Sequence, residues 1–261
     1  IQMYAENNQE AYDNMVQAFR ISGHKDVRLP IMICQDGFIT SHAVENIELL
    51  EDAEVKGFVG EYEPENYLLN PECPMAVGPY SVTDFYMEAK RNQAEGMKHV
   101  EKVVLDVAKE FAEMSGREYG LFEAYKLEDA DRAVVMIGSA AGTTKDAIDK
   151  LRAQGEKVGL LKIRLYRPFP AEAIAEALKN VKAVAVMDRA EGYTNHGGPL
   201  GSDVMAAMFR ARSTALATNI IYGLGGRDVR VEDMEQVFAD LQTMIDNDNA
   251  GETYRYMGIR E

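Results

Sequence analysis

Between residues 131 and 226, short apolar runs alternate with longer runs whose apolar residues recur at helical spacing. The first three short runs are rich in Val and do not alternate with polar residues, which is typical of strands buried on both faces. The longer runs are long enough to be the crossovers that parallel strands require. The pattern therefore predicts an open parallel sheet flanked by helices. Its strands are expected in RAVVMIG (132–138), KVGLLKIRL (157–165), VKAVAVMD (181–188) and ATNIIYG (217–223).

The carboxyl ends of parallel strands share one edge of a sheet, and ligands and partners bind at that edge. We therefore expect chemistry first in the loops that follow the four strands. These loops are 138–142, 166–170, 188–201 and 223–228.

The first part of the chain predicts a second, smaller α/β unit. IQMY reads as a strand, and the helix after it has an Asn at its N-cap, Glu10 in its first turn and Gly23 at its end. A second strand, LPIMIC (29–34), runs directly into the polar loop QDGFITSH. Because the chain opens on Ile within a strand, we expect it to be part of a longer polypeptide.

Four prolines between Gly57 and Tyr80 exclude a regular helix there and predict an extended connector. A long helix is expected from Ser81 to Gly116. Its apolar seam, from Met97 to Met114, predicts either a core or a subunit contact, and packing inside the same subunit is slightly favoured. The domains are accordingly placed at 1–56, 57–80 and 81–261.

Three further segments complete the prediction. Residues 119–130 read as a link, and 229–247 as an amphipathic helix that closes the second domain. The last twelve residues show no period and predict a tail that docks on something.

Composition excludes several classes of protein. With 46% hydrophobic and 27% charged residues the chain is an ordinary globular protein, and its apolar runs are too short to cross a bilayer. The net charge of −15 repels phosphate backbones and anionic lipid surfaces. We therefore expect a cytoplasmic protein with neither a nucleic-acid nor a membrane partner.

Cys34 and Cys73 are the only cysteines, so the chain cannot supply the four thiolates of an ordinary iron–sulfur cluster. So few cysteines favour free thiols in a reducing compartment over a disulfide between the two. The four histidines are dispersed without metal-ligand spacing, and no protein-bound metal is predicted.

Three loops carry weak signals for ligand binding. Gly138 to Gly142, with Ser139 and Thr143–Thr144, lacks the G-x-G-x-x-G spacing of nucleotide sites, so a plain turn with a Thr N-cap is favoured over phosphate binding. The helix after 188–201 could hold an anion at its N-terminus, while His196 in that loop suits a surface or interface. Arg167 could clamp a carboxylate or phosphate, although pairing with an acidic side chain is favoured.

The loop QDGFITSH brings four candidate side chains into one short segment. Asp36, Thr40, Ser41 and His42 lie at one strand-to-loop junction. Adjacent Ser and His side chains are expected to point in different directions, which disfavours a hydrolase dyad. No complete active site emerges, which predicts a chain that contributes to a composite assembly.

Six segments in this order resemble the α subunits of pyruvate:ferredoxin oxidoreductases (pyruvate synthases), of the 2-oxoacid:ferredoxin oxidoreductase family. The resemblance implies that 81–261 is a transketolase C-terminal-like α/β domain, preceded by the end of an α/β domain that binds the thiamine pyrimidine. On this resemblance, the first part of that domain would lie outside this chain. The segments are IQMYAENNQEAYD, LPIMICQDGFITSH, VVMIGSAAGTTKDAID, KVGLLKIRLYRPFP, VMDRAEGYTNHGGPLGSD and IIYGLGGRDV.

The resemblance also implies a reaction, the reversible CoA-dependent oxidative decarboxylation of pyruvate to acetyl-CoA and CO2, with electrons passed to ferredoxin. Thiamine diphosphate with Mg and iron–sulfur clusters would be held mainly by β-, γ- and δ-type sister subunits or by missing segments. The isolated chain would then be inactive and bind no cofactor. Asp36, Thr40, Ser41 and His42 match a family motif near the subunit interface and are the candidate site residues.

Two other functions stay open. The chain could be the transketolase-like C-terminal domain of another thiamine diphosphate enzyme, such as the β chain of a 2-oxoacid dehydrogenase. It could also be a non-catalytic assembly subunit. Copurifying partners separate these alternatives: iron-containing chains, a lipoyl-bearing acyltransferase, or none.

Overall fold

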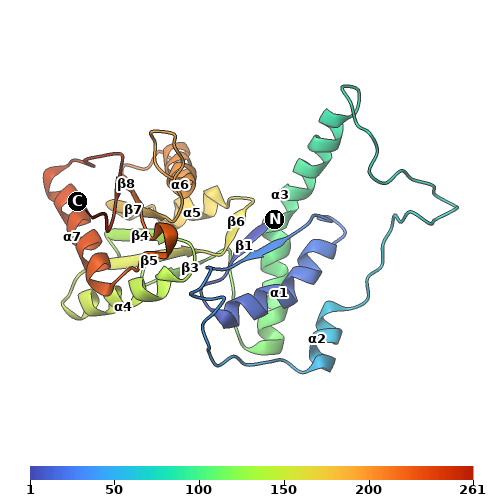
Figure 1. The fold of residues 1–261 in the computed structure, drawn as a ribbon, viewed down its shortest axis with the longest axis horizontal. Helices are drawn as coiled ribbons and strands as arrows, with labels where there is room; N and C mark the ends of the chain where they lie inside the picture. The colour runs from blue at the N-terminus through green and yellow to red at the C-terminus, as the bar shows by residue number, and fades with distance from the viewer. Residues whose placement is uncertain (261) are drawn as a thin grey trace.

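The computed structural model describes residues 1–260 and contains two β-sheets (Figure 1). The larger sheet consists of six strands. In spatial order they are β3 (Phe122–Tyr125), β5 (Val158–Ile163), β4 (Arg132–Met136), β7 (Ala183–Asp188), β8 (Leu216–Ile221) and β9 (Tyr254–Tyr256). The four predicted strands are β4, β5, β7 and β8, and the neighbours among them pair in parallel. The predicted α/β fold with an open parallel sheet is therefore confirmed.

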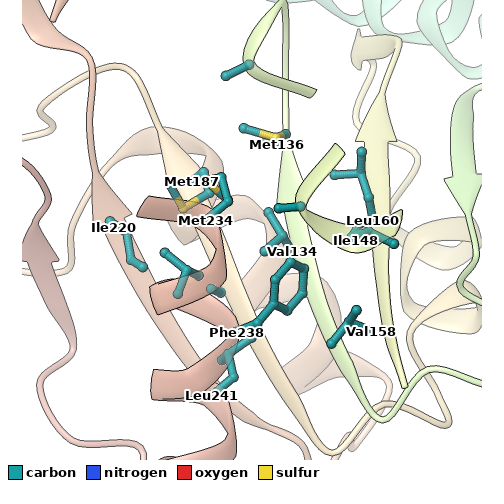
Figure 2. Packing of buried hydrophobic residues seen from close by; sticks show 14 of the residues in the cluster. Val134, Met136, Ile148, Val158, Leu160, Met187, Ile220, Met234, Phe238 and Leu241 are labelled. Atoms are coloured by element: carbon teal, nitrogen blue, oxygen red, sulfur yellow. The ribbon is translucent and has the colours of Figure 1, made fainter. Parts of the chain in front are cut away.

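Helices cover both faces of this sheet because its strands are apolar on both sides. α4 (Ala140–Ala153) and α7 (Val231–Asn247) pack on one face, and α5 (Ala171–Ala177) and α6 (Pro199–Arg210) pack on the other. Figure 2 shows the first face, where Phe238 of α7 lies beside Val134 of β4. Full burial of a side chain of this size contributes about 1.5–3 kcal/mol.

Two edge strands were absent from the sequence prediction. The predicted link at 119–130 contains β3, which pairs antiparallel with β5. The predicted tail contains β9, which pairs in parallel with β8. The predicted docking of the tail is confirmed, since it pairs with β8. The lack of a strand in the link and in the tail was wrong, because strands of three or four residues are too short to show a period in the sequence.

The smaller sheet has the order β2-β1-β6, with β1 (Gln2–Tyr4) between β2 (Met32–Cys34) and β6 (Leu165–Arg167). β1 is parallel to β2 and antiparallel to β6. Since β6 follows β5 after a single residue, one extended segment passes from the larger sheet into the smaller one.

α1 (Asn8–Gly23) begins where the sequence predicted. The Asn7 side chain accepts a hydrogen bond from the Glu10 backbone N–H at 2.9 Å and caps the helix. This cap holds the first turn of α1 beside the strands of the smaller sheet.

α3 (Tyr86–Ser115) packs on the smaller sheet through the predicted seam. Its buried residues Val100, Val104 and Val107 share one core with Met3 of β1 and Ile21 of α1. The favoured packing within the same chain is therefore confirmed. The helix begins at Tyr86, five residues later than predicted, and its first turns project away from the sheets (Figure 1).

Between α1 and α3 the chain is mostly irregular. α2 (Asp52–Val59) includes the first residues of the predicted connector, and residues 60–85 form neither helix nor strand. In Figure 1 these residues loop away from the rest of the molecule. None of the helices within residues 1–260 has the length and hydropathy needed to cross a membrane.

Candidate functional site

The loop after β2 meets the carboxyl edge of the larger sheet. Asp36 lies beside Gly138, which follows β4, and beside Arg189, which follows β7. Arg189 in turn donates a hydrogen bond from Nε to the carbonyl of Gly223, which follows β8, at 3.3 Å. Three of the four predicted loops therefore converge on the DGFITSH motif, as expected for strand ends along one edge.

An open hollow of about 680 Å³ lies at this junction. Its floor and walls come from the motif, from Arg189 and from the glycine-rich loop after β8. The lining residues are 35–39, Arg189, 223–226 and Asp228. Phe38 is 79% exposed at its rim, so the hollow has an apolar margin open to solvent.

Asp36 fixes the loop in place. Its Oδ2 accepts a hydrogen bond from the Ser139 backbone N–H at 2.6 Å, and its Oδ1 lies 3.2 Å from Nη1 of Arg189. The carboxylate thus occupies the N-terminus of α4, where the helix dipole favours negative charge. A phosphate has no free place there, and the predicted Thr N-cap is wrong because Ser139 is the N-cap residue and Asp36 supplies the acceptor.

Gly138 allows this close approach. It has φ +85°, and an added Cβ would lie 3.0 Å from Asp36 Oδ2. Only glycine adopts this backbone conformation readily and leaves room for the carboxylate.

The other three motif candidates point elsewhere. Thr40 is buried and donates to the Glu6 carbonyl at 3.4 Å. Ser41 accepts from the Phe38 N–H at 2.9 Å, and its Oγ lies 2.7 Å from Nδ1 of His42. The expectation that Ser41 and His42 point apart was wrong, because the backbone forms turns here. Both side chains are exposed, and His42 stacks on Phe38 with ring centroids 4.5 Å apart.

The glycine-rich loop after β7 is closed by a buried polar network. Asp188 accepts from the N–H groups of Leu200 at 3.1 Å and Gly201 at 2.7 Å, and from Nδ2 of Asn219 at 3.0 Å. Burial raises the pKa of the Asp188 carboxyl, and the two N–H groups and Asn219 oppose that shift. Since this carboxylate already caps α6, the predicted anion position at this helix N-terminus is filled.

Two further predictions on these loops have clear outcomes. Arg167 pairs with Asp203 at 2.8 Å, so the favoured pairing with an acidic side chain is confirmed. His196 is exposed in the loop before α6. Neither side chain lines the hollow beside Asp36.

A second charged cluster, which sequence reasoning missed, joins α1 to the larger sheet. Lys162 of β5 is buried and lies 2.6 Å from Glu6, 2.8 Å from Glu123 and beside Glu10. Lys145 of α4 pairs with Glu6 at 2.8 Å and with Glu123 at 3.0 Å. A Lys in an apolar strand was the only signal in the sequence.

The residue after β5 adds a buried cation to this junction. Arg164 donates to Asn14 at 2.7 Å, Gln17 at 3.0 Å and the Gly120 carbonyl at 3.1 Å, all of them neutral acceptors. Burial lowers the pKa of its guanidinium to about 10, although Glu10 opposes the shift. These bonds hold α1 against the segment that passes between the two sheets.

Neither the cluster around Lys162 nor the helix N-termini beside Asp36 and Asp188 fit a cofactor. Glu6, Glu10 and Glu123 lie close enough together to hold a metal ion, but Lys162 occupies the space among them. A diphosphate with Mg²⁺ needs oxygen ligands and free N–H donors. The N-termini of α4 and α6 are occupied by Asp36 and Asp188. Within residues 1–260 we therefore derive no catalytic step through thiamine diphosphate.

Comparison with a solved structure identifies the fold. The fold resembles a 2-oxoglutarate:ferredoxin oxidoreductase from Magnetococcus marinus, with a TM-score of 0.60 and 15% identity over 92% of this chain and 42% of that one. That structure has 2-oxoglutarate, coenzyme A and succinyl-CoA bound. This likeness shows that the two chains share an α/β fold.

Sequence comparison narrows the class. Residues 1–109 match the thiamine-diphosphate-binding region of pyruvate flavodoxin/ferredoxin oxidoreductases, and residues 130–234 match core domain II of pyruvate:ferredoxin oxidoreductases. The whole chain is 44% identical to the pyruvate synthase subunit PorA of Thermotoga maritima and 40% identical to that of Methanocaldococcus jannaschii. The chain belongs to the pyruvate:ferredoxin oxidoreductase family. It spans 66% and 65% of the length of these two relatives.

Proposed function

We propose that this chain works as part of the α subunit of a pyruvate synthase. The enzyme would convert pyruvate and coenzyme A reversibly to acetyl-CoA and CO2 and pass the electrons to ferredoxin. The observation that carries this proposal is the 44% identity to a pyruvate synthase subunit across all 261 residues. The motif loop DGFITSH and the converging strand ends lie within that matched span.

Thiamine diphosphate with Mg²⁺ and the iron–sulfur clusters would be held mainly by parts of the enzyme outside this chain. Thiamine diphosphate supplies the electron sink for decarboxylation when it is bound. Two cysteines, Cys34 and Cys73, are too few for a cluster, and both are free thiols. The partners would be β-, γ- and δ-type sister subunits and ferredoxin, in the cytoplasm.

We assign the motif loop a positioning role at the boundary with a sister subunit. Asp36 holds the loop to α4 and Arg189, and this leaves Phe38, Ser41 and His42 exposed in one short segment. Such an arrangement presents side chains to a neighbour while the backbone stays fixed. The hollow beside Arg189 would then be completed by residues of that neighbour.

The same proposal includes the boundary between the two domains, which we place at residues 57–80. Proteases should cut the irregular residues there first. The two fragments should stay associated under native conditions, because α3 packs on β1 and α1. Cleavage within α3 instead would contradict this division.

The activity is tested on the anaerobically purified complex that contains this chain. Reduction of ferredoxin should require both pyruvate and CoA, and pyruvate should give a higher kcat/KM than 2-oxoglutarate or branched 2-oxoacids. Faster turnover of 2-oxoglutarate would overturn the choice of substrate. A lipoyl-bearing acyltransferase in place of iron-containing chains would overturn the reaction.

The isolated chain provides a second test of where the cofactor is held. Calorimetry should show no stoichiometric binding of thiamine diphosphate with Mg²⁺ to the chain alone. Tight binding at one site per chain would refute the proposal that the cofactor is held elsewhere.

A further inference from the structure

Residues 61–87, here called the arm, leave the body of the molecule between α2 and the first turn of α3 (Figure 1). Most of the apolar side chains of the arm are exposed. Leu69 is 84% exposed, Tyr80 92% and Phe85 67%. So many exposed large apolar side chains in one segment are typical of a site for protein–protein contact. The others of this kind are Tyr62, Tyr67, Leu68, Met75, Val77, Val82, Tyr86 and Met87.

Among residues 1–260, the contacts that hold the arm to the body lie near the arm's beginning. Glu65 pairs with Arg28 at 3.1 Å, and Glu61, Tyr62 and Glu63 line a hollow beside the end of α1. Further along, the described hydrogen bonds of residues 66–85 join residues at most four positions apart in the chain. Together with the exposed fractions above, this leaves the apolar side chains from Tyr67 to Met87 facing solvent within the described residues.

Proline restricts this segment to extended conformations before any partner binds. Pro64, Pro71, Pro74 and Pro79 each fix φ and disfavour helix at the preceding residue. A segment that is already extended loses less conformational entropy when it docks. The composition of the arm therefore favours binding in the form that Figure 1 shows.

Charge decides what kind of partner fits. The arm contains five acidic residues and no basic residue. The surrounding stretch, 29–89, holds twelve acidic residues and one basic residue, Lys56, and so carries −11 of the chain's net charge of −15. Two arms facing each other would bring the same negative surfaces together, and like charges oppose that contact.

We propose that the arm is the docking surface for a different polypeptide, whose matching face carries exposed apolar side chains among Lys and Arg. The apolar side chains supply the buried area, and the acidic ones select the partner and set its register. This inference holds for any complex in which the chain works, so it does not depend on the reaction proposed above.

Photo-crosslinking in the intact complex tests the identity of the partner. Benzoylphenylalanine is placed at Leu69 or Tyr80 in the arm, and at Phe209 of α6 as a control with similar exposure. The arm positions should crosslink to a different polypeptide, within a peptide rich in Lys or Arg, and Phe209 should not reach that peptide. Crosslinks to a second copy, to this chain itself, or none at all would overturn the proposal.

Charge reversal tests the selectivity. The triple variant Glu61→Lys, Glu63→Lys, Glu72→Lys changes three exposed arm residues. The matched control, Glu113→Lys, Glu128→Lys, Glu252→Lys, makes the same change in charge on exposed positions of the body. We expect the arm variant to raise the Kd for the crosslinked partner at least tenfold and the control to raise it less than threefold.

Both triple variants should unfold at the same temperature as the parent, because all six side chains are solvated. Equal effects of the two variants on the Kd would show that net charge alone matters and would overturn the arm as the docking surface. The salt dependence of binding should also weaken in the arm variant only.

Discussion

The carboxylate of Asp36 accepts a hydrogen bond from the backbone N–H of Ser139 at 2.6 Å, across 103 residues of the chain. This bond joins the motif loop after β2 to the first turn of α4. The sequence did not show this cap of α4, because its acceptor, Asp36, belongs to a segment far from the helix in the chain.

Loss of the Asp36 carboxylate should destabilise this junction. We expect Asp36→Ala to lower the free energy of unfolding by about 1–2 kcal/mol, because removal of an N-capping acceptor costs about that much. Urea denaturation of the purified protein measures the change. Asp36→Asn, which keeps an acceptor oxygen, should lose less. An unchanged stability together with unchanged proteolysis of residues 37–42 would show that the bond does not anchor the loop.

Removal of the buried ammonium of Lys162 should lower the free energy of unfolding by more than the loss of the Asp36 carboxylate does. Lys162→Met leaves Glu6 and Glu10 facing each other without their main counter-ion, and breaking a buried pair costs about 3–5 kcal/mol. Denaturant titration at neutral pH measures the loss. Lys98→Met, on the exposed surface of α3, is the matched control and should change stability by less than about 0.5 kcal/mol. Similar losses of stability in both variants would contradict the claim that burial makes the ion pairs of Lys162 important.

The pH dependence of this cluster follows from the same contacts. Burial alone would lower the pKa of Lys162, but Glu10 and Glu6 outweigh it and raise the pKa above its ordinary value. A base of this kind stabilises the fold below its unfolded pKa of about 10.4 and loses that contribution as the pH rises through the folded value. The stability difference between parent and Lys162→Met should thus stay constant from about pH 8 to about pH 10 and shrink above that. A difference that grows with alkaline pH would refute the assignment.

The hydrogen-bond network around Asp188 predicts that replacing its carboxylate with an amide destabilises the fold. Asp188→Asn would place an NH₂ group against the N–H of Leu200 or Gly201, which leaves a buried donor unpaired and costs about 1–3 kcal/mol. Thermal unfolding followed by circular dichroism measures this. Asp246→Asn, on the exposed side of α7, should be near neutral. An Asp188→Asn variant as stable as the parent would mean that water or rearrangement satisfies these donors.

Two glycines should respond to alanine in opposite directions. At Gly159 of β5 a Cβ would lie 2.6 Å from the Lys126 carbonyl oxygen and 2.9 Å from the Leu127 Cα, so overpacking should cost about 1–3 kcal/mol. At Gly57 of α2 a Cβ meets nothing within 4 Å, and helix propensity should raise stability by about 0.4–1 kcal/mol. Chemical denaturation of both variants tests the pair, and changes of the same sign would contradict the described backbone contacts.

The sequence by itself determined the four buried parallel strands of the larger sheet and the helices that cover them. These features are local, because a run such as VKAVAVMD shows its burial on both faces without reference to the rest of the chain. It also determined the family, through six motifs in a fixed order, and drew attention to Asp36, Thr40, Ser41 and His42.

Only the tertiary structure decided which distant groups meet. It separated Asp36, which binds Ser139 and Arg189, from the exposed pair Ser41 and His42. It placed Lys162 among three carboxylates and made strands of β3 and β9. The physical reason is that hydrogen bonds, ion pairs and short edge strands draw their stability from neighbours remote in sequence, and no local period records those neighbours.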